Sequence, residues 1–310
     1  MKAVLCEALG SPENLVIADI PAPEPREGEV LVRVKAVGLN FLDTLIIEGR
    51  YQVKPPLPFS PGAEMAGEVL RGGKRFRAGD RVMGFFGHGC AREMIAVCED
   101  SLVKIPDALD DARAAGLCIT YGTSLHALKD RAQLKPGETL AVLGASGGVG
   151  QAAIEIGKAM GARVVACASD DRKLAFCKAL GADILVNYTA NDLKQALRDV
   201  EGGVDVVYDP VGGDFTEAAL RALGFGGRLL VVGFAQGGIP KLPLNIVLLK
   251  GADILGVYWG EHTKREPELH RANMDQLTAW AASGTIRPHI HKIYALEEIA
   301  VALDAIARRE

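Results

Sequence analysis

Short, nearly continuous apolar runs alternate with helix-like stretches from about residue 139 onward. The apolar runs are "TLAVLGA", "RVVACAS", "DILVNY", "VDVVYDPV", "GRLLVVGFA" and "DILGVYW". Helices are expected at 148–160, at 171–180 and over "FTEAALRAL". Apolar strands that alternate with helices are typical of a parallel sheet covered on both faces. The pattern therefore predicts a doubly wound α/β domain.

The first 120 residues or so follow a different pattern. Short β runs such as "EVLVRVKAVGLN" and "AREMIAVCEDSLVKI" are separated by turn signals such as "PAPEPREGE" and "RGGKRFRAGD", which indicates an irregular β domain. Residues 110–130 have a helical period, with Asp110 or Asp111 as the cap. After residue 261 we expect a helix at 273–283, a short β piece "HIHKIYAL" and a last helix at 296–309. The predicted domains are 1–121 with 261–310, and 122–260.

Composition narrows the class of protein. The chain has 310 residues, is 49% hydrophobic and carries a formal net charge of −4. Its charges are interspersed, which disfavours nucleic acid and anionic membranes as partners. No run of about 18 apolar residues occurs and Glu7 comes early, so we expect a soluble cytoplasmic protein without a signal peptide. The six scattered cysteines are expected to be free thiols.

A glycine-rich turn follows the first apolar run of the α/β pattern. Residues 145–150, "ASGGVG", have the spacing of a G-x-G-x-x-G motif with alanine in the first position. Gly147 lets the backbone approach a pyrophosphate, Gly150 lets the helix pack on the sheet, and the helix N-terminus offers N–H groups to the phosphates. The turn lies between a strand and a helix, as the motif requires. We expect a nicotinamide dinucleotide here; the alternative is a turn that serves packing alone.

The end of the next strand bears on the choice between NAD and NADP. An NAD site usually has an acidic residue about 20 positions after the motif, for the ribose 2′-hydroxyl. Here the strand ends at Ser169, and the aspartates at 170–171 come at a helix start, where they can act as caps. Arg172, Lys173 and Tyr188 are candidates for holding a 2′-phosphate, which the aspartates would repel if they faced it. We expect NADPH as the cofactor.

The order of these segments resembles that of the medium-chain dehydrogenase/reductases. The segments "GLNFLDTLIIEGRY", "LPFSPGAEMAGEV", "AGDRVMG", "GASGGVGQAA" and "YDPVGGDF" are similar to the zinc-free quinone oxidoreductase branch, the relatives of zeta-crystallin. The resemblance covers nearly the whole chain. It implies a GroES-like irregular β catalytic domain and a Rossmann doubly wound parallel-sheet domain. It also implies a homodimer that pairs Rossmann edge strands, with "ADILGVYW" as the apolar candidate edge.

The family's zinc enzymes allow a test for metal ligands. They supply a Cys, a His-Glu pair and a second Cys, and a catalytic zinc needs about three protein ligands. At the matching places this chain has Asn40, Ala63 with Glu64, and Gly116, so only Glu64 remains of that set. The other possible ligands are expected to be ordinary surface or core residues: His88 near Cys90, and His289 with His291. A site without metal is therefore expected.

Without a Lewis acid, a quinone or an α,β-unsaturated carbonyl is easier to reduce than a simple ketone, because conjugation delocalises the added charge. By the resemblance, Asn40 lies beside the nicotinamide and donates a hydrogen bond to the developing oxyanion, and Tyr51 borders the substrate cleft. Asn40 could instead be a turn residue, and Tyr51 a packing or interface aromatic. Leu45 replaces a second family tyrosine, which implies a more apolar pocket. Asp43 is expected to orient the loop.

The resemblance also assigns the cofactor-binding residues. They are Thr123 near the nicotinamide and phosphates, Ser146, Gly147, Gly148 and Val149 in the pyrophosphate loop, Ser169, Lys173 and Tyr188 at the 2′-phosphate, Gly233 and Phe234 beside the nicotinamide, and Val257, Tyr258 and Trp259 on the far side of the cofactor. Alternative roles are a helix-interior threonine at 123, solvated residues at the 2′ end, and dimer-interface aromatics at 258 and 259.

The sequence thus predicts an NADPH-dependent, zinc-free oxidoreductase that transfers hydride to a quinone or an α,β-unsaturated carbonyl. Two alternatives stay open. One is a carbonyl reductase of the alcohol dehydrogenase type, against which the missing zinc ligands argue. The other is a non-enzymatic NADPH-binding relative with a crystallin or RNA-binding role.

Overall fold

The computed structural model describes residues 1–309. The chain forms two compact units: unit 1 comprises Met1–Ile119 and Met274–Glu310, and unit 2 comprises Thr120–Asn273. Unit 1 is therefore made of two segments, and unit 2 is a single continuous segment between them. The functional division predicted from the sequence, at 121/122 and 260/261, stays a prediction.

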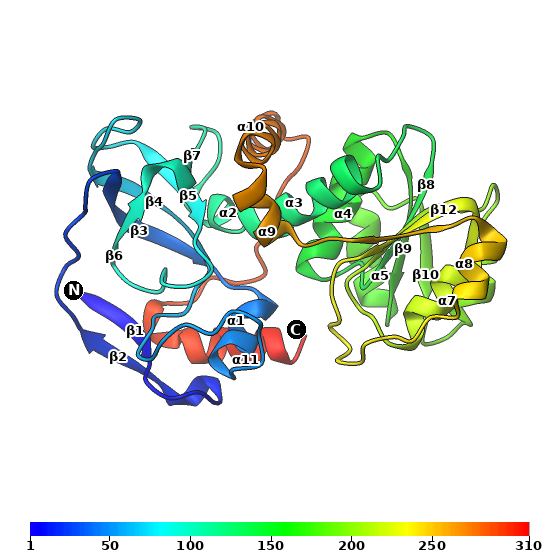
Figure 1. The fold of residues 1–310 in the computed structure, drawn as a ribbon, viewed down its shortest axis with the longest axis horizontal. Coiled ribbons are helices and arrows are strands. Elements are labelled where there is room, and N and C mark those ends of the chain that lie inside the picture. Colours follow the sequence, from blue (N-terminus) through cyan, green and yellow to red (C-terminus); the bar gives the residue numbers. More distant parts are fainter. Residues whose placement is uncertain (310) are drawn as a thin grey trace. The chain divides into compact units, whose positions relative to one another are not determined.

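Unit 2 is built on a six-stranded parallel sheet (Figure 1). Its strands are β8 (Thr139–Leu143), β9 (Arg163–Ala168), β10 (Ile184–Asn187), β11 (Val204–Asp209), β12 (Leu223–Val231) and β13 (Asp253–Gly256). Five of the six apolar runs contain one of these strands, and "GRLLVVGFA" covers the second half of β12, which begins four residues before the run. Their order across the sheet is β10-β9-β8-β11-β12-β13, so the direction of winding reverses between β8 and β11. In sheets of this kind, ligands bind outside the carboxyl ends of the strands at that switch point.

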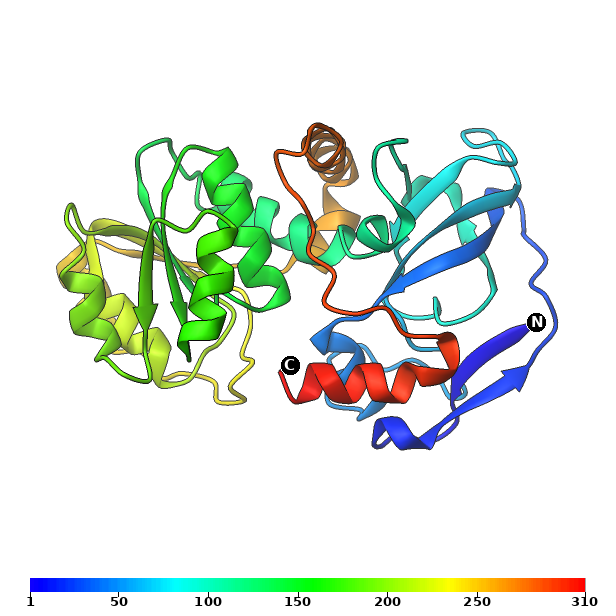
Figure 2. The ribbon, with the colours of Figure 1, turned by 180° about the vertical axis from the view of Figure 1, so that it is seen from behind.

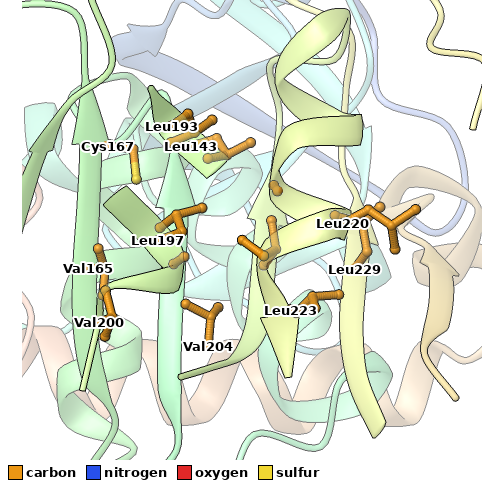
Figure 3. Packing of buried hydrophobic residues seen from close by; sticks show 14 of the residues in the cluster. Leu143, Val165, Cys167, Leu193, Leu197, Val200, Val204, Leu220, Leu223 and Leu229 are labelled. Atoms are coloured by element: carbon orange, nitrogen blue, oxygen red, sulfur yellow. The ribbon is translucent and has the colours of Figure 1, made fainter. Parts of the chain in front are cut away.

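Helices and a buried core accompany the sheet of unit 2. The helices are α3 (Cys118–Leu125, which begins in unit 1), a π-helical segment (His126–Arg131), α4 (Gly148–Ala159), α5 (Asp171–Ala179), α6 (Leu193–Arg198), α7 (Asp214–Ala222), α8 (Leu244–Lys250), α9 (Trp259–Arg265) and α10 (Pro267–Ser283, which ends in unit 1). On one face of the sheet, Leu197 of α6 and Leu220 of α7 belong to one buried cluster with alternate residues of the strands, including Leu143 and Val165 (Figure 3). Side chains alternate between faces along a strand, which leaves the other face for α4.

Unit 1 contains a five-stranded antiparallel sheet and a two-stranded one. The strands are β1 (Lys2–Cys6), β2 (Leu15–Asp19), β3 (Glu29–Gly38), β4 (Glu64–Arg71), β5 (Arg81–Phe85), β6 (Met94–Cys98) and β7 (Leu102–Lys104). The larger sheet has the order β6-β3-β4-β5-β7, and β1 pairs with β2. The unit also holds the helices α1 (Phe41–Ile47), α2 (Asp111–Ala115) and α11 (Ile299–Ala307), together with the second half of α10. Figures 1 and 2 show α11 beside α1, and Leu303 is buried with Val4 and Ile46.

Several local expectations can be compared with the structure. Asp110 caps α2 by accepting a hydrogen bond from the N–H of Arg113, as predicted. The β piece predicted over "HIHKIYAL" (289–296) is wrong, because residues 289–295 pair with no strand, Leu296 begins a 3-10 helix and Ile293 is largely exposed. An alternating pattern alone does not supply a partner for the backbone. None of the helices in residues 1–309 is long and apolar enough to cross a membrane.

Candidate functional site

The glycine-rich turn connects the end of β8 to the start of α4. Gly147 is the N-cap of α4, and no side chain caps this helix. A Cβ on Gly150 would lie 2.4 Å from the carbonyl oxygen of Gly144, so only glycine allows this packing, whereas a Cβ on Gly147 would be 3.4 Å from the same oxygen. Gly147 and Gly148 are exposed, and Ser146 and Val149 are half-buried. The N–H groups of the first turn of α4 are thus accessible to a phosphate.

A buried hydrogen-bond network joins this turn to α3. The Ser124 hydroxyl lies 2.8 Å from the carbonyl oxygen of Thr120, 3.1 Å from that of Val149 and 2.9 Å from the Tyr208 hydroxyl. Thr123, predicted to contact the cofactor, is the half-buried neighbour of Ser124 on α3. Sequence reasoning missed the roles of Ser124 and Tyr208, since a single serine in an apolar helix carries no motif. The network fixes the start of α4 relative to the helix that carries Thr123.

The residues predicted for the 2′-phosphate meet at the end of β9. Lys173 Nζ lies 3.2 Å from Ser169 Oγ and 3.6 Å from Asp170 Oδ2. Asp170 is the N-cap of α5 and accepts a hydrogen bond from the N–H of Lys173. That bond, with the lysine charge, lowers the pKa of Asp170. The question left open by the sequence is thereby answered for Asp170, which acts as a cap.

Tyr188 and Asp171 also lie near the ends of β9 and β10. The Tyr188 N–H donates to the carbonyl oxygen of Ala168 at 3.2 Å, and its ring lies 4.7 Å from that of Phe215. Tyr188 therefore follows β10 directly beside the end of β9. Asp171 is exposed and accepts a hydrogen bond from Asn187 Nδ2 at 2.9 Å.

The loops after β11 and β12 are bound to each other. Asp209, the last residue of β11, accepts hydrogen bonds from the N–H groups of Val211 and Gly212 and from the Thr216 hydroxyl. Its own carbonyl oxygen accepts from the N–H of Gly233 at 3.3 Å. A Cβ on Gly233 would lie 3.2 Å from the carbonyl oxygen of Pro210. The buried Asp209 carboxylate thus shapes the support for Gly233 and for the exposed Phe234. Its position at the end of an apolar strand is a signal that sequence reasoning did not use.

The three residues after β13 differ in exposure. The Val257 N–H continues the strand by donating to the carbonyl oxygen of Val231 at 3.0 Å. Tyr258 is exposed, whereas Trp259 is buried. A Cβ on Gly122 would lie 2.7 Å from the Trp259 ring, so the indole packs closely on α3 next to Thr123. Trp259 therefore supports α3 from within unit 2.

Asn40 of unit 1 is held by two buried carboxyl groups. Its N–H donates to Asp43 Oδ2 at 2.7 Å, and its Nδ2 donates to Glu64 Oε1 at 2.7 Å and makes a longer contact of 3.4 Å with the carbonyl oxygen of Gly38. The other Glu64 oxygen accepts from the N–H of Ile119 at 2.8 Å. Burial raises the pKa of Asp43 to about 7 and that of Glu64 to about 8, while these hydrogen bonds act in the opposite direction.

Tyr51, also in unit 1, lies in the loop after α1, four residues beyond the end of that helix. Its N–H donates to the carbonyl oxygen of Leu45 at 3.2 Å, and its half-buried ring packs against the cluster that includes Ile46 and Ile47. Leu45 itself is half-buried. Asn40 and Tyr51 thus belong to unit 1, while every residue predicted to bind the cofactor belongs to unit 2.

Comparisons with known proteins agree with this arrangement. Residues 26–107 match the alcohol dehydrogenase GroES-like domain, and residues 148–275 match the zinc-binding dehydrogenase family. The chain is 37% identical over 315 residues to quinone oxidoreductase-like protein 2 of Bos taurus, covering all of this chain and 90% of that protein. The chain belongs to the quinone oxidoreductase branch of the medium-chain dehydrogenase/reductases.

Solved structures extend the match to three dimensions. A probable oxidoreductase from Mycobacterium abscessus has a TM-score of 0.91 with 37% identity, covering all of this chain and 96% of that one. The quinone oxidoreductase from Thermus thermophilus, solved alone and in complex with NADPH, has a TM-score of 0.88 with 34% identity, covering all of this chain and 97% of that one. The predicted family and fold class, a GroES-like domain with a Rossmann domain, are confirmed. The chain is therefore an oxidoreductase.

The name of one matching family raises the question of zinc. At the positions that correspond to the family's zinc ligands, Asn40 and Gly116 carry no thiol, and both Glu64 oxygens accept hydrogen bonds from the protein. These residues do not fit a catalytic zinc. Across residues 1–309, one group of His, Cys, Asp or Glu side chains has its ligand atoms within 4.8 Å: His126, Asp130 and His262 of unit 2. Its two imidazole rings stack 3.8 Å apart, so their in-plane lone pairs do not converge on one point.

Proposed function

We propose that this chain is an NADPH-dependent oxidoreductase that transfers hydride to a quinone or an α,β-unsaturated carbonyl without a metal ion. One observation carries the proposal: where zinc ligands would converge, Asn40 Nδ2 donates a 2.7 Å hydrogen bond to Glu64. The NADPH complex of the Thermus thermophilus relative supports the choice of cofactor. A conjugated acceptor follows from the same observation, because it needs less polarisation than a simple ketone.

The residues of unit 2 suit the three main parts of NADPH: the pyrophosphate, the 2′-phosphate and the nicotinamide. The exposed Gly148, which begins α4, suits the pyrophosphate at the helix N-terminus, while the N–H of Gly147 donates to the carbonyl oxygen of Gly144 at 3.0 Å and holds the turn. Ser169 Oγ and Lys173 Nζ, 3.2 Å apart, suit the 2′-phosphate. Bound NADPH supplies a hydride from the nicotinamide. The loop with Gly233 and Phe234, fixed to the loop after β11, suits the wall beside that ring.

Asn40 would stabilise the charge that develops on the substrate oxygen. One Nδ2 hydrogen is engaged by Glu64, and the hydrogen bond of the second one to the Gly38 carbonyl oxygen is long at 3.4 Å, so a substrate oxygen would replace it at low cost. A donor fixed before the reaction lowers the barrier without reorganising during it. Tyr51 would border the substrate, and Leu45 would make the pocket more apolar.

The test is NADPH oxidation by the purified chain after dialysis against a chelator, with a panel of quinones, enals and enones. We expect turnover to survive chelation and Asn40→Ala to lower kcat by about 10- to 100-fold, since one oxyanion donor is worth at most about 10²–10³ in rate. The dissociation constant of NADPH, measured by fluorescence, should not change. Activity that is lost on chelation and restored by zinc would contradict the metal-free proposal.

A further inference from the structure

Glu64 is placed beside Asn40 by strand pairing and close packing. The antiparallel register of β3 and β4 sets Glu64 opposite Gly38, two residues before Asn40. A Cβ on Gly38 would lie 2.7 Å from Glu64 Oε1 and 2.2 Å from the carbonyl oxygen of Ala115. Only glycine at position 38 therefore lets the carboxyl group approach the backbone at this point.

The burial of this carboxyl group is costly. Glu64 is 1% exposed, and the groups that act on it are hydrogen-bond donors and the neighbouring acid Asp43, with no cation among them. An acid buried without a cationic partner destabilises a fold unless its hydrogen bonds compensate. Buried acids without a cationic partner, which break the usual rules of stable packing, are expected at functional sites. Here the partners are the Asn40 amide and the N–H of Ile119.

We propose that Glu64 is a positioning residue for the reaction: its carboxyl group fixes the Asn40 amide so that an Nδ2 hydrogen faces the substrate oxygen. This inference rests on the proposed function. An asparagine amide has two orientations that exchange its nitrogen and oxygen. Because Oε1 accepts the hydrogen bond, Glu64 selects the orientation with Nδ2 on its side. The second hydrogen of that nitrogen makes only a long 3.4 Å bond to the Gly38 carbonyl oxygen, which the substrate oxygen would replace.

The protonation of Glu64 is consistent with this role. Burial raises its pKa to about 8, which favours the neutral carboxyl group at pH 7; Oε1, which accepts from Asn40 Nδ2, is then its carbonyl oxygen. A neutral group holds Asn40 without opposing negative charge on the substrate, whereas a carboxylate would oppose it. The acid Asp43 and the buried thiols of Cys90 and Cys118 also face this region, and burial raises all three of their pKa values.

The experiment is a double-mutant cycle on kcat with NADPH and a quinone. We expect Glu64→Met to lower kcat about 10- to 100-fold, as Asn40→Ala does, with the dissociation constant of NADPH unchanged. In the Asn40→Ala background, Glu64→Met should have no further effect beyond twofold, because Glu64 acts through Asn40. Glu68→Met, on the same strand but half-exposed, is the matched control and should keep wild-type kcat.

A second measurement covers the case in which Glu64→Met fails to fold. Glu64→Gln keeps the shape and an acceptor oxygen, so kcat at pH 7 should recover to within about tenfold of wild type. The wild-type kcat should fall as pH rises through about 8, and the Gln variant should lack that fall. Three outcomes with an active wild type overturn this inference and leave the proposed function standing. The first is an unchanged kcat in Glu64→Met, and the second is fully multiplicative effects of the two substitutions on kcat. The third is a pH profile of Glu64→Gln that equals that of the wild type. A wild type without turnover overturns the proposed function as well.

Discussion

Glu64 and Asp43 give stability an unusual dependence on pH. Both carboxyl groups are buried, and their pKa values are raised to about 8 and about 7, whereas in an unfolded chain they ionise near 4.5 and 3.8. Between these limits the unfolded chain binds fewer protons than the folded one. The stability that these two groups contribute is therefore fully present below about pH 4 and is lost as pH rises toward 8.

We expect the melting temperature to fall between pH 5 and pH 8 and to fall less in Glu64→Gln. Each group changes the free energy of unfolding by at most about 1.4 kcal/mol per pH unit. Calorimetry on both proteins over this range is the measurement. Parallel curves for the wild type and the variant would mean that Glu64 is already ionised at pH 5.

We expect Lys173 to discriminate between the two cofactors, because only NADPH carries a 2′-phosphate. Lys173→Ala should raise KM for NADPH by about 10- to 100-fold, since a hydrogen bond to a charged group is worth about 1.5–3 kcal/mol, and should leave KM for NADH nearly unchanged. Lys178→Ala, on the exposed face of α5, is the control. Equal effects of Lys173→Ala on both cofactors would place Lys173 in solvent.

At the scale of an element, two glycines of one turn should separate folding from binding. A Cβ at Gly150 would press on the carbonyl oxygen of Gly144 at 2.4 Å, while one at Gly147 would stay at 3.4 Å. Gly150→Ala should lower the melting temperature by several degrees, since strain of about 1–3 kcal/mol is expected. Gly147→Ala should keep the melting temperature and weaken NADPH binding. The reverse pattern, measured by calorimetry and fluorescence titration, would contradict the proposed pyrophosphate site.

The parallel sheet and its glycine turn could be predicted because the sequence signals are local. Each strand carries a nearly continuous apolar run, and the turn needs glycine for steric reasons at fixed spacing. The Asn40–Glu64 hydrogen bond could not be predicted, because it joins residues 24 apart through the register of two strands.

The sequence pattern also does not predict two short helices, α6 and α1, the second of which begins directly after Asn40.

At the scale of the whole molecule, one edge of the unit-2 sheet exposes apolar side chains that a second copy of the chain could cover. β13 is an edge strand, and next to it Phe225 and Leu248 are 89% and 80% exposed. Exposed apolar edges promote association. We therefore keep the proposal of a homodimer formed through β13, a contact between two copies of unit 2.

Sedimentation at micromolar protein should show a dimer for the wild type. Leu248→Glu combined with Ile254→Lys should give a folded monomer, because it buries charge at the proposed interface. Val301→Glu changes an exposed apolar residue of α11 in unit 1 and should stay dimeric. A wild type that sediments only as a monomer would remove this proposal.

The two-segment construction of unit 1 has a consequence for biosynthesis. The cluster around Val4 and Ile46 contains Ile299 and Leu303 from α11, which the ribosome adds about 250 residues after Ile46. All of unit 2 is translated in the meantime, and domains generally fold as units while the chain grows. At roughly 5–20 residues per second, the first segment waits on the order of ten seconds or more for the helix that completes its core. During that interval the apolar faces of β1 and α1 are open to chaperones.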